Sequence, residues 1–273
     1  MNRSYVPDGA ALRCHLVVAL LGLALAGSIA ACGSDTTATG TASTTTATST
    51  AAPVIDPGDG GDYHPTLDPA DFVRAIDNPY LPLRPGARWV YEGDNAGDAE
   101  RVEVTVTDQT RVIEGITAVV VRDTVTIGGV LAEDTYDWFA QDKDGNVWYL
   151  GEDSTEYDEE GRPASDGGSW EYGTDGALPG IAMPADPTAG MAYRQEFLRG
   201  TAEDMGQILG IEPERTIGLG AYQDVVLVEE WTPLEPDVVE HKWYAPGIGQ
   251  IAGLSVAGER STSELVEFTA GQR

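Results

Sequence analysis

Residues 119–138, VVVRDTVTIGGVLAEDTYDW, decide the fold because they indicate two strands joined by a tight turn. Apolar side chains fall on alternate positions on each side of the glycine pair Gly128-Gly129. The residues that share a face are Val119, Val121, Val125 and Ile127 before the pair, and Val130, Ala132, Tyr136 and Trp138 after it. A period of two is typical of a half-buried strand, and paired glycines favour a hairpin turn.

The same alternation continues through most of the chain and predicts further strands. They are 101–107, 147–150, 225–231, 238–244, 248–256 and 264–269. Asp144-Gly145 predicts a type I′ hairpin, Glu160-Gly161 closes the next hairpin, and Pro246-Gly247 separates two C-terminal strands. We expect a mainly β fold: a single antiparallel meander of roughly ten strands, forming a curved half-barrel or a barrel, since long sheets must protect their edges.

Helical signals are confined to two short stretches. Asp68 supplies an N-cap, Pro69 suits the first helical position, and Phe72 and Ile76 are an apolar pair about one turn apart. Residues 204–210 form the other candidate. One or two short helices are therefore expected beside the sheet.

The N-terminal region carries an export signal. Residues 16–27, LVVALLGLALAG, are shorter than the about 20 residues that a membrane span needs, and are typical of a signal-peptide core. Residues 28–32, SIAAC, resemble the bacterial lipobox. That resemblance implies removal of a lipoprotein signal peptide, 1–31, and attachment of a diacylglyceryl group to Cys32. An ordinary secretory signal with a chance cysteine is the alternative.

The rest of the chain divides into a tether and a domain. Residues 32–67 are rich in Thr, Ala and Gly and offer few large apolar side chains, so we expect a disordered tether before a β-rich domain at 68–273. Cys14 leaves with the signal peptide and Cys32 is acylated, so no disulfide is expected. A net charge of −29 excludes nucleic acid as a partner and disfavours anionic lipid headgroups. The membrane is therefore contacted through the lipid anchor.

Signals for catalysis or metal binding are weak. The acidic loop 142–146 is a calcium candidate, but its glycine is fourth, whereas an EF-hand loop needs it sixth, so a hairpin turn is preferred. His64 and His241 are too few for a zinc site. Ser255 misses the spacing of a hydrolase nucleophile motif by one residue. The sequence predicts no metal, no cofactor and no catalytic residue.

Aromatic residues in the predicted strands suggest a binding surface. We take Trp138, Trp148, His241 and Trp243 as candidates for a concave face that receives a ligand. Ordinary cross-strand pairing and core filling are the other interpretation of the same residues.

Several longer strings resemble an uncharacterised family of secreted bacterial proteins and lipoproteins. They are NPYLPLRPGARWVYEG (78–93), DWFAQDKDGNVWYLGED (137–153), GSWEYGTDGALPGIAMPADP (168–187), YRQEFLRGTAEDM (193–205) and EEWTPLEPDVVEHKWYAPGIGQI (229–251). This resemblance implies export and assigns no activity. The patterns PLxPGxxWxY at 82–91 and YAPGIG at 244–249 are also similar to envelope proteins of the LolA type, which implies a half-barrel with an apolar interior.

Together these observations predict a membrane-anchored extracytoplasmic lipoprotein, on the outer face of the cell membrane. We expect a non-catalytic envelope module that binds an apolar ligand or an envelope protein. The alternative is a secreted, glycosidase-like hydrolase that uses paired carboxylates. A deep apolar cavity would favour the first, and two carboxylates about 5 to 9 Å apart in a polar cleft would favour the second.

Overall fold

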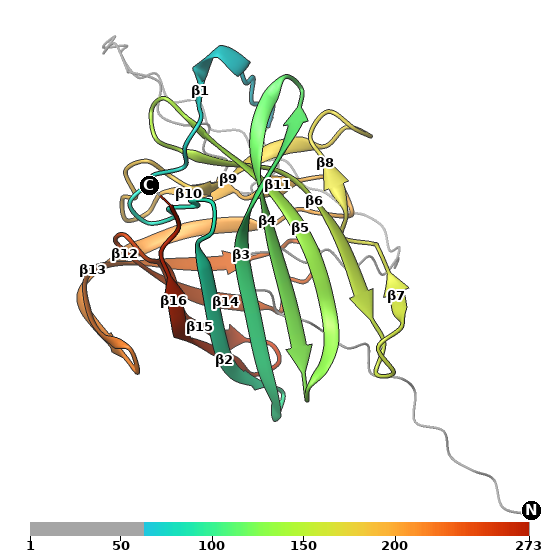
Figure 1. Ribbon diagram of the computed structural model, residues 1–273, viewed down its shortest axis with the longest axis vertical. Helices are drawn as coiled ribbons and strands as arrows, with labels where there is room; N and C mark the ends of the chain where they lie inside the picture. The colour runs from blue at the N-terminus through green and yellow to red at the C-terminus, as the bar shows by residue number, and fades with distance from the viewer. Residues whose placement is uncertain (1–62, 273) are drawn as a thin grey trace, which may run out of the picture.

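The computed structural model describes residues 63–272, shown in Figure 1. The signal peptide 1–31, Cys32 and all but the last five residues of 32–67 lie outside the described residues. Tyr63 is already packed against the barrel, since it is 4% exposed and its hydroxyl donates to the carbonyl oxygen of Pro179 at 2.6 Å. Packing thus includes residues before position 68.

Sixteen strands and one 3₁₀ turn, η1 (Pro69–Asp71), make up the described fold. The strands are β1 (Phe72–Val73), β2 (Arg88–Asn95), β3 (Asp98–Ile113), β4 (Ile116–Ile127), β5 (Val130–Asp142), β6 (Val147–Tyr157), β7 (Pro163–Ser165), β8 (Trp170–Glu171), β9 (Leu178–Met183), β10 (Ala192–Arg194), β11 (Glu196–Phe197), β12 (Met205–Ile217), β13 (Gly220–Trp231), β14 (Val239–Ala245), β15 (Gly249–Ala257) and β16 (Ser261–Thr269). Every pair of neighbouring strands is antiparallel, which confirms the predicted fold class.

The sheet is a nearly closed barrel. Its strand order is β10-β12-β13-β14-β15-β16-β2-β3-β4-β5-β6-β9-β11, so sequence neighbours are mostly sheet neighbours, as in a meander. β10 and β11 are almost contiguous in the chain, yet β10 pairs with β12 at one end of the sheet and β11 pairs with β9 at the other. The chain itself therefore joins the two ends. In Figure 1, β3 to β6 run vertically and β12 to β14 cross behind them.

The predicted hairpin turns are mostly present. β4 ends at Ile127 and β5 begins at Val130, and both intervening glycines have positive φ, at 59° and 85°. Asp144-Gly145 also lies in a hairpin, but its type is not I′, because among this pair only Gly145 has a positive φ. The carboxylate of Asp142 organises the turn instead, accepting the backbone N–H groups of Asp144 and Asn146 at 3.0 and 2.9 Å.

The helix predicted at Asp68 is present as a short 3₁₀ turn with the predicted cap and proline, whereas the helix predicted at 204–210 is wrong. The turn at Asp68 is a cap on three 3₁₀ residues, and Phe72 then leaves the turn to pair with Asp142 of β5. Residues 205–210 belong to β12, where pairing with β13 and full burial of Met205 and Ile208 override the weak helical pattern.

A β-bulge changes which side chains of β5 face the barrel interior. Thr126 pairs with Leu131 but Val125 pairs with Glu133, so Ala132 is the extra residue. A bulge shifts the side-chain alternation by one position. The predicted face of Val130, Ala132, Tyr136 and Trp138 is therefore wrong beyond the bulge, and the residues that point inward are Glu133, Thr135, Asp137 and Phe139.

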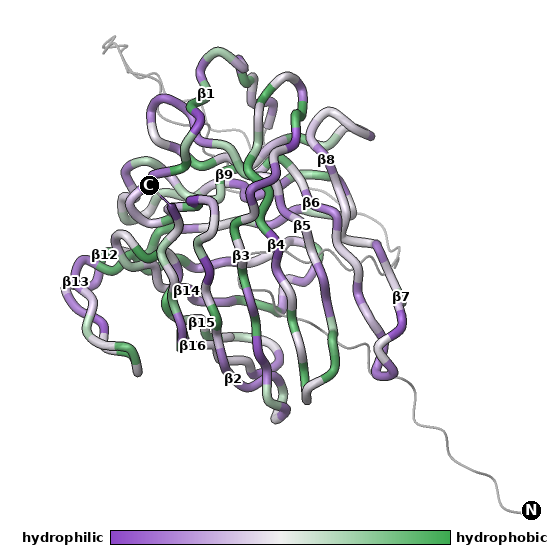
Figure 2. The backbone as a smooth tube through the Cα atoms, in the orientation of Figure 1, coloured by the Kyte–Doolittle hydropathy of each residue, from purple (hydrophilic) through white to green (hydrophobic). Residues whose placement is uncertain are grey.

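The barrel interior combines an apolar core with polar side chains. Figure 2 shows hydrophobic and hydrophilic residues alternating along the vertical strands. The largest fully buried side chains include Tyr149, Tyr193, Phe139, Ile181 and Met183. Leu81 and Leu83, from the proline-rich segment before β2, also contact the interior cavity.

Candidate functional site

The four predicted ligand-binding residues do not converge on one pocket. His241 and Trp243, both on β14, pack edge to face with ring centroids 6.0 Å apart. They point outward, because side chains alternate along a strand and the next residues in the sequence, Lys242 and Tyr244, line the interior cavity. His241 Nε2 lies 3.2 Å from Glu229 Oε2.

Each tryptophan of the predicted set is held by its own polar partner. The guanidinium of Arg111 lies 4.0 Å from the ring centroid of Trp138, outside the barrel. Trp148 Nε1 donates to Asp142 Oδ2 at 2.8 Å, in the β5–β6 turn. These contacts indicate structural packing. Of the four predicted residues, His241 and Trp243 are the pair whose rings contact each other in the described structure.

Sequence reasoning missed a cluster of buried acids inside the barrel. Its members, each at most 8% exposed, are Glu100, Asp123, Glu133, Asp137, Glu152, Glu196, Asp204 and Glu230, and we call them the acid cluster. The buried basic residues among the described positions are Arg194 and Lys242. The eight buried carboxyl groups thus outnumber the two buried cations by four to one. Because charges are costly to bury without partners, several of these carboxyls must be neutral.

Asp137 and Glu152 form the centre of the acid cluster. They are direct cross-strand partners on β5 and β6. The Tyr149 hydroxyl lies 2.6 Å from Asp137 Oδ1 and 2.8 Å from Glu152 Oε2. A phenol has one proton to donate, so the second contact is a hydrogen bond only if that carboxyl is protonated and donates to the phenol oxygen. The Asp137–Glu152 pair therefore holds a proton.

Burial sets the protonation of this pair. It raises the pKa of Asp137 to about 7. Burial, and then the charge of Asp137, raises the pKa of Glu152 well above its usual range. Two coupled carboxyls that share a proton titrate as one unit.

Asp123 and Glu133 extend the cluster across β4 and β5. Glu133 Oε1 accepts the hydroxyls of Thr135 and Ser154 at 2.7 and 3.3 Å. Both carboxyl oxygens of Asp123 are buried without a hydrogen-bond partner among the described residues. Burial, followed by the charges of Asp137 and Glu133, raises the pKa of Asp123 well above its ordinary value. The unpartnered oxygens and the raised pKa both favour the neutral form of Asp123 in the folded barrel.

On the opposite wall, Lys242 and Glu230 form a buried ion pair. Lys242 Nζ lies 2.5 Å from Glu230 Oε2, and both side chains are 6% exposed. Gln195 Nε2 donates to Glu230 Oε1 at 3.0 Å. The charges of Glu230 and Lys242 act on Asp204 in opposite directions. Burial has the larger effect and raises the pKa of Asp204 to about 8. The one lysine inside the barrel is thus already engaged.

The cavity that the described residues line inside the barrel is small. A cavity of about 30 Å³ is lined by residues that include Tyr91, Phe139, Tyr149, Lys242, Tyr244 and Gln250. That volume suits one or two water molecules, whereas a site for an organic ligand occupies about 300 Å³ or more. The interior therefore differs from the apolar half-barrel implied by the second resemblance.

Within residues 63–272, no group of three or more His, Cys, Asp or Glu side chains has an arrangement that could hold a metal ion. No helix in that range is both long and apolar enough to cross a membrane.

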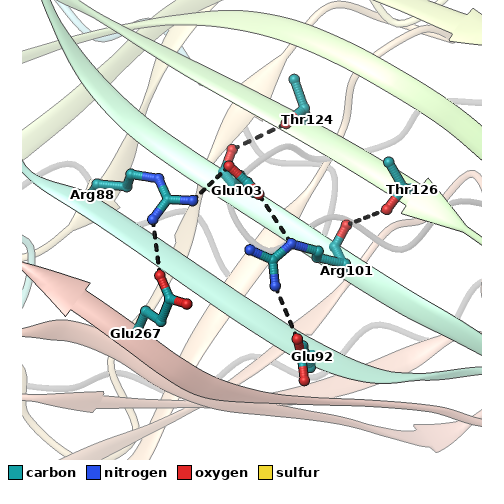
Figure 3. A network of polar contacts seen from close by, with 7 residues as sticks. All are labelled: Arg88, Glu92, Arg101, Glu103, Thr124, Thr126 and Glu267. Carbon is teal, nitrogen blue, oxygen red and sulfur yellow. Dashed lines mark hydrogen bonds and ion pairs between the residues drawn. The ribbon is translucent and has the colours of Figure 1, made fainter. Parts of the chain in front are cut away.

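The outer face of β2, β3 and β16 carries a different charge pattern, shown in Figure 3. Arg88 bridges Glu103 and Glu267 at 2.7 and 3.1 Å. Arg101 bridges Glu103 and Glu92 at 3.0 and 2.9 Å. Each arginine on this face is paired with glutamates on the same or neighbouring strands. We therefore call this exposed face an ion-pair ladder and do not treat it as a binding site.

Comparison with known proteins adds little. No protein-family model matches the sequence, and no curated protein matches it. One similar solved structure is a protein from Bacteroides fragilis, predicted to be exported and described as having a YmcC-like fold, with a TM-score of 0.40 and 16% identity over 72% of this chain and 100% of that chain. Another, from Parabacteroides distasonis and predicted to be a lipoprotein, has a TM-score of 0.36 and 11% identity over 71% of this chain and 99% of that chain. Likenesses this distant support no conclusion about activity.

Proposed function

We propose that the protein is an extracytoplasmic lipoprotein anchored through Cys32, whose barrel binds an envelope protein through its outer surface and performs no catalysis. The observation that supports it is the small interior cavity: as lined by the described residues it measures about 30 Å³, too small for an acyl chain, a sugar or a nucleotide. Binding is therefore assigned to the outside of the barrel.

The outer face of β14 and β15 is the surface we assign to the partner. Leu254 of β15 pairs directly with His241 of β14. The side chains of Leu254 and Val256 are 38% and 46% exposed. Trp243 lies on the same side of β14 but is only 6% exposed, because the Arg215 guanidinium lies 3.6 Å from its ring centroid and its Nε1 donates to Glu212 Oε1 at 2.9 Å. Exposed aliphatic side chains beside an aromatic pair suit a protein interface. In a chain with a net charge of −29, charge complementarity favours a partner with a basic rim.

Membrane anchoring is tested by fractionation. Cys32→Ala should move the protein from the detergent-soluble membrane fraction to the aqueous fraction. Wild type that partitions into the aqueous fraction, or a variant that stays with the membrane, would contradict the lipid anchor.

Partner binding is tested by site-specific photocrosslinking in cells. A crosslinker at Leu254 should capture a discrete protein, with a yield that falls as salt is raised, because a basic rim is screened by salt. A crosslinker at Glu267, on the ion-pair ladder, is the matched control. Equal capture from both positions, or capture from neither, would count against the assigned face.

The paired-carboxylate alternative has one feature in its favour. Asp137 and Glu152 are opposite each other in register, and cross-strand neighbours place their Cβ atoms about 5 Å apart. Both are at most 2% exposed, and neither lines the interior cavity. A glycoside would therefore not reach them in this closed barrel.

A further inference from the structure

Residues 192–204 close the barrel, and we call this segment the seam. On one side of it β10 pairs with β12 over three residues, and on the other β11 pairs with β9 over two. One of those two pairs is Glu196 with Pro179, and proline has no N–H to donate to a strand partner. Closure therefore depends on few backbone contacts.

The seam carries two members of the acid cluster. Glu196 Oε2 accepts Trp170 Nε1 at 2.7 Å, while its Oε1 is buried with no hydrogen-bond partner in the described region. Asp204 Oδ1 is likewise buried and unpaired within that region. These oxygens are acceptable inside the barrel only if the groups are neutral.

Ionisable groups face the seam from several neighbouring strands. Glu196 is exposed to the charges of Asp137 on β5, Glu152 on β6 and Asp204 on the seam itself. The groups that act on Asp204 from β13 and β14 are Glu230, Glu240 and Lys242. Lys242 already contacts Glu230 at 2.5 Å and Glu240 at 3.7 Å, which leaves the acids of β5 and β6 without a nearby counter-charge from it.

Besides the exposed Arg199, the seam itself carries one buried basic residue, Arg194. Its guanidinium carbon lies 4.4 Å from the ring centroid of Phe197 and 5.6 Å from that of Tyr63. These two rings connect Arg194 to the seam and to the N-terminal end of the domain.

We infer that the barrel is closed at the seam only while the acid cluster holds its protons, and that the seam opens as the pH rises past neutrality. Ionised carboxylates on β5, β6 and the seam repel one another in a low-dielectric space. The weakest strand pairing that separates them is that of β9 with β11, so opening relieves the repulsion at the least loss of structure.

The direction of the pH effect follows from burial. Burial raises the pKa of Asp137 to about 7 and that of Asp204 to about 8, and it raises the pKa of Glu196 well above its usual range. A carboxyl whose pKa is raised on folding stabilises the folded state fully in acid, and that stability is lost as the pH climbs through the raised pKa. The closed seam is therefore the acid form.

Hydrogen exchange by mass spectrometry on the full-length protein tests this inference. Between about pH 5 and about pH 9, after correction for intrinsic exchange rates, seam peptides should lose roughly tenfold or more in protection while β3 and β4 lose far less. Equal seam protection at both pH values, or the same loss in every strand, would overturn it.

A matched set of variants assigns the effect to the seam carboxyls. The double variant Glu196→Gln and Asp204→Asn should keep the seam protected at both pH values. In the control variant Glu103→Gln, on the outer ion-pair ladder, the seam should still open as the pH rises, as it does in wild type. A double variant that still opens at high pH refutes the inference. Should that variant fail to fold, the comparison of wild type at the two pH values decides alone.

Discussion

Replacing Glu133 by Gln measures how strongly the acid cluster couples folding to pH. Glu133 Oε1 accepts hydroxyls from Thr135 and Ser154, bonds that an amide oxygen accepts equally well. The substitution keeps the shape of the side chain and removes its ionisation. The other carboxyl oxygen lacks a hydrogen-bond partner in the described structure, so the amide nitrogen disrupts no bond there.

The expected magnitude follows from linkage. Burial raises the pKa of Glu133 from 4.5 to about 7. The group stays protonated in the fold while the unfolded chain ionises, so its stabilising contribution is complete below about pH 4.5 and is lost as the pH rises through about 7. At about 1.4 kcal/mol per pH unit, wild type loses about 3 kcal/mol across this window that the Gln variant retains.

Urea denaturation followed by tryptophan fluorescence gives the free energy of unfolding at each pH from about 4 to about 8. The two proteins should have similar stability in acid and diverge towards neutral pH, with the variant more stable. Glu103→Gln is the control of opposite sign, because hydrogen bonding to Arg88 lowers the pKa of Glu103 and its contribution is present at neutral pH and lost in acid. Parallel curves for wild type and Glu133→Gln would refute the reasoning.

Other substitutions test the buried ion pair and the seam. Lys242→Met should destabilise by about 3 to 5 kcal/mol at neutral pH in urea denaturation, because Glu230 is left buried without its cation, and adding Glu230→Met should recover most of the loss. Recovery of nothing would show that the lysine acts through packing alone. Gly180→Ala should destabilise by about 1 to 3 kcal/mol in a thermal melt, since its Cβ would lie 2.0 Å from the Gln195 carbonyl oxygen across the seam. Gly210→Ala, with nothing within 4 Å, should melt within a few degrees of wild type, and an equal loss in both variants would discount the close approach at the seam.

Local sequence signals predicted β3 to β6, β13 to β16 and most turns, because both depend on near neighbours, but they gave no strand range for β1, β2 or β7 to β12. The alternation of 119–127 and the glycine pair after it are enough to define β4 and its hairpin. The type of the next hairpin was not predictable from Asp144-Gly145 alone, since Asp142 supplies bonds that stabilise a longer turn. Likewise, only pairing with the distant β13 turns residues 205–210 into a strand.

The acid cluster escaped prediction for a related reason. The bulge at Ala132 reverses the alternation of β5, and nothing in the local composition marks it. Asp123 did carry a signal, because it lies between Val121 and Val125 on the face that alternation assigns to the core. An acid on an apolar face is the feature that merits attention in such a strand. The seam joins residues far apart in the chain, which periodicity does not reveal.

The acid cluster also bears on why the barrel interior is polar at all. An apolar core of the same volume would be more stable at neutral pH, since buried charges and protonated carboxyls both oppose folding there. Asp137 and Glu152 nevertheless face each other across β5 and β6 with Tyr149 between them, and Glu196 brings a third carboxyl to the same place from the seam. Such an arrangement makes barrel closure depend on bound protons, a property that an interior of valine and leucine does not have. Proton-dependent closure therefore gives a physical reason for acids at these positions, and exchange at the seam is where that reason is tested.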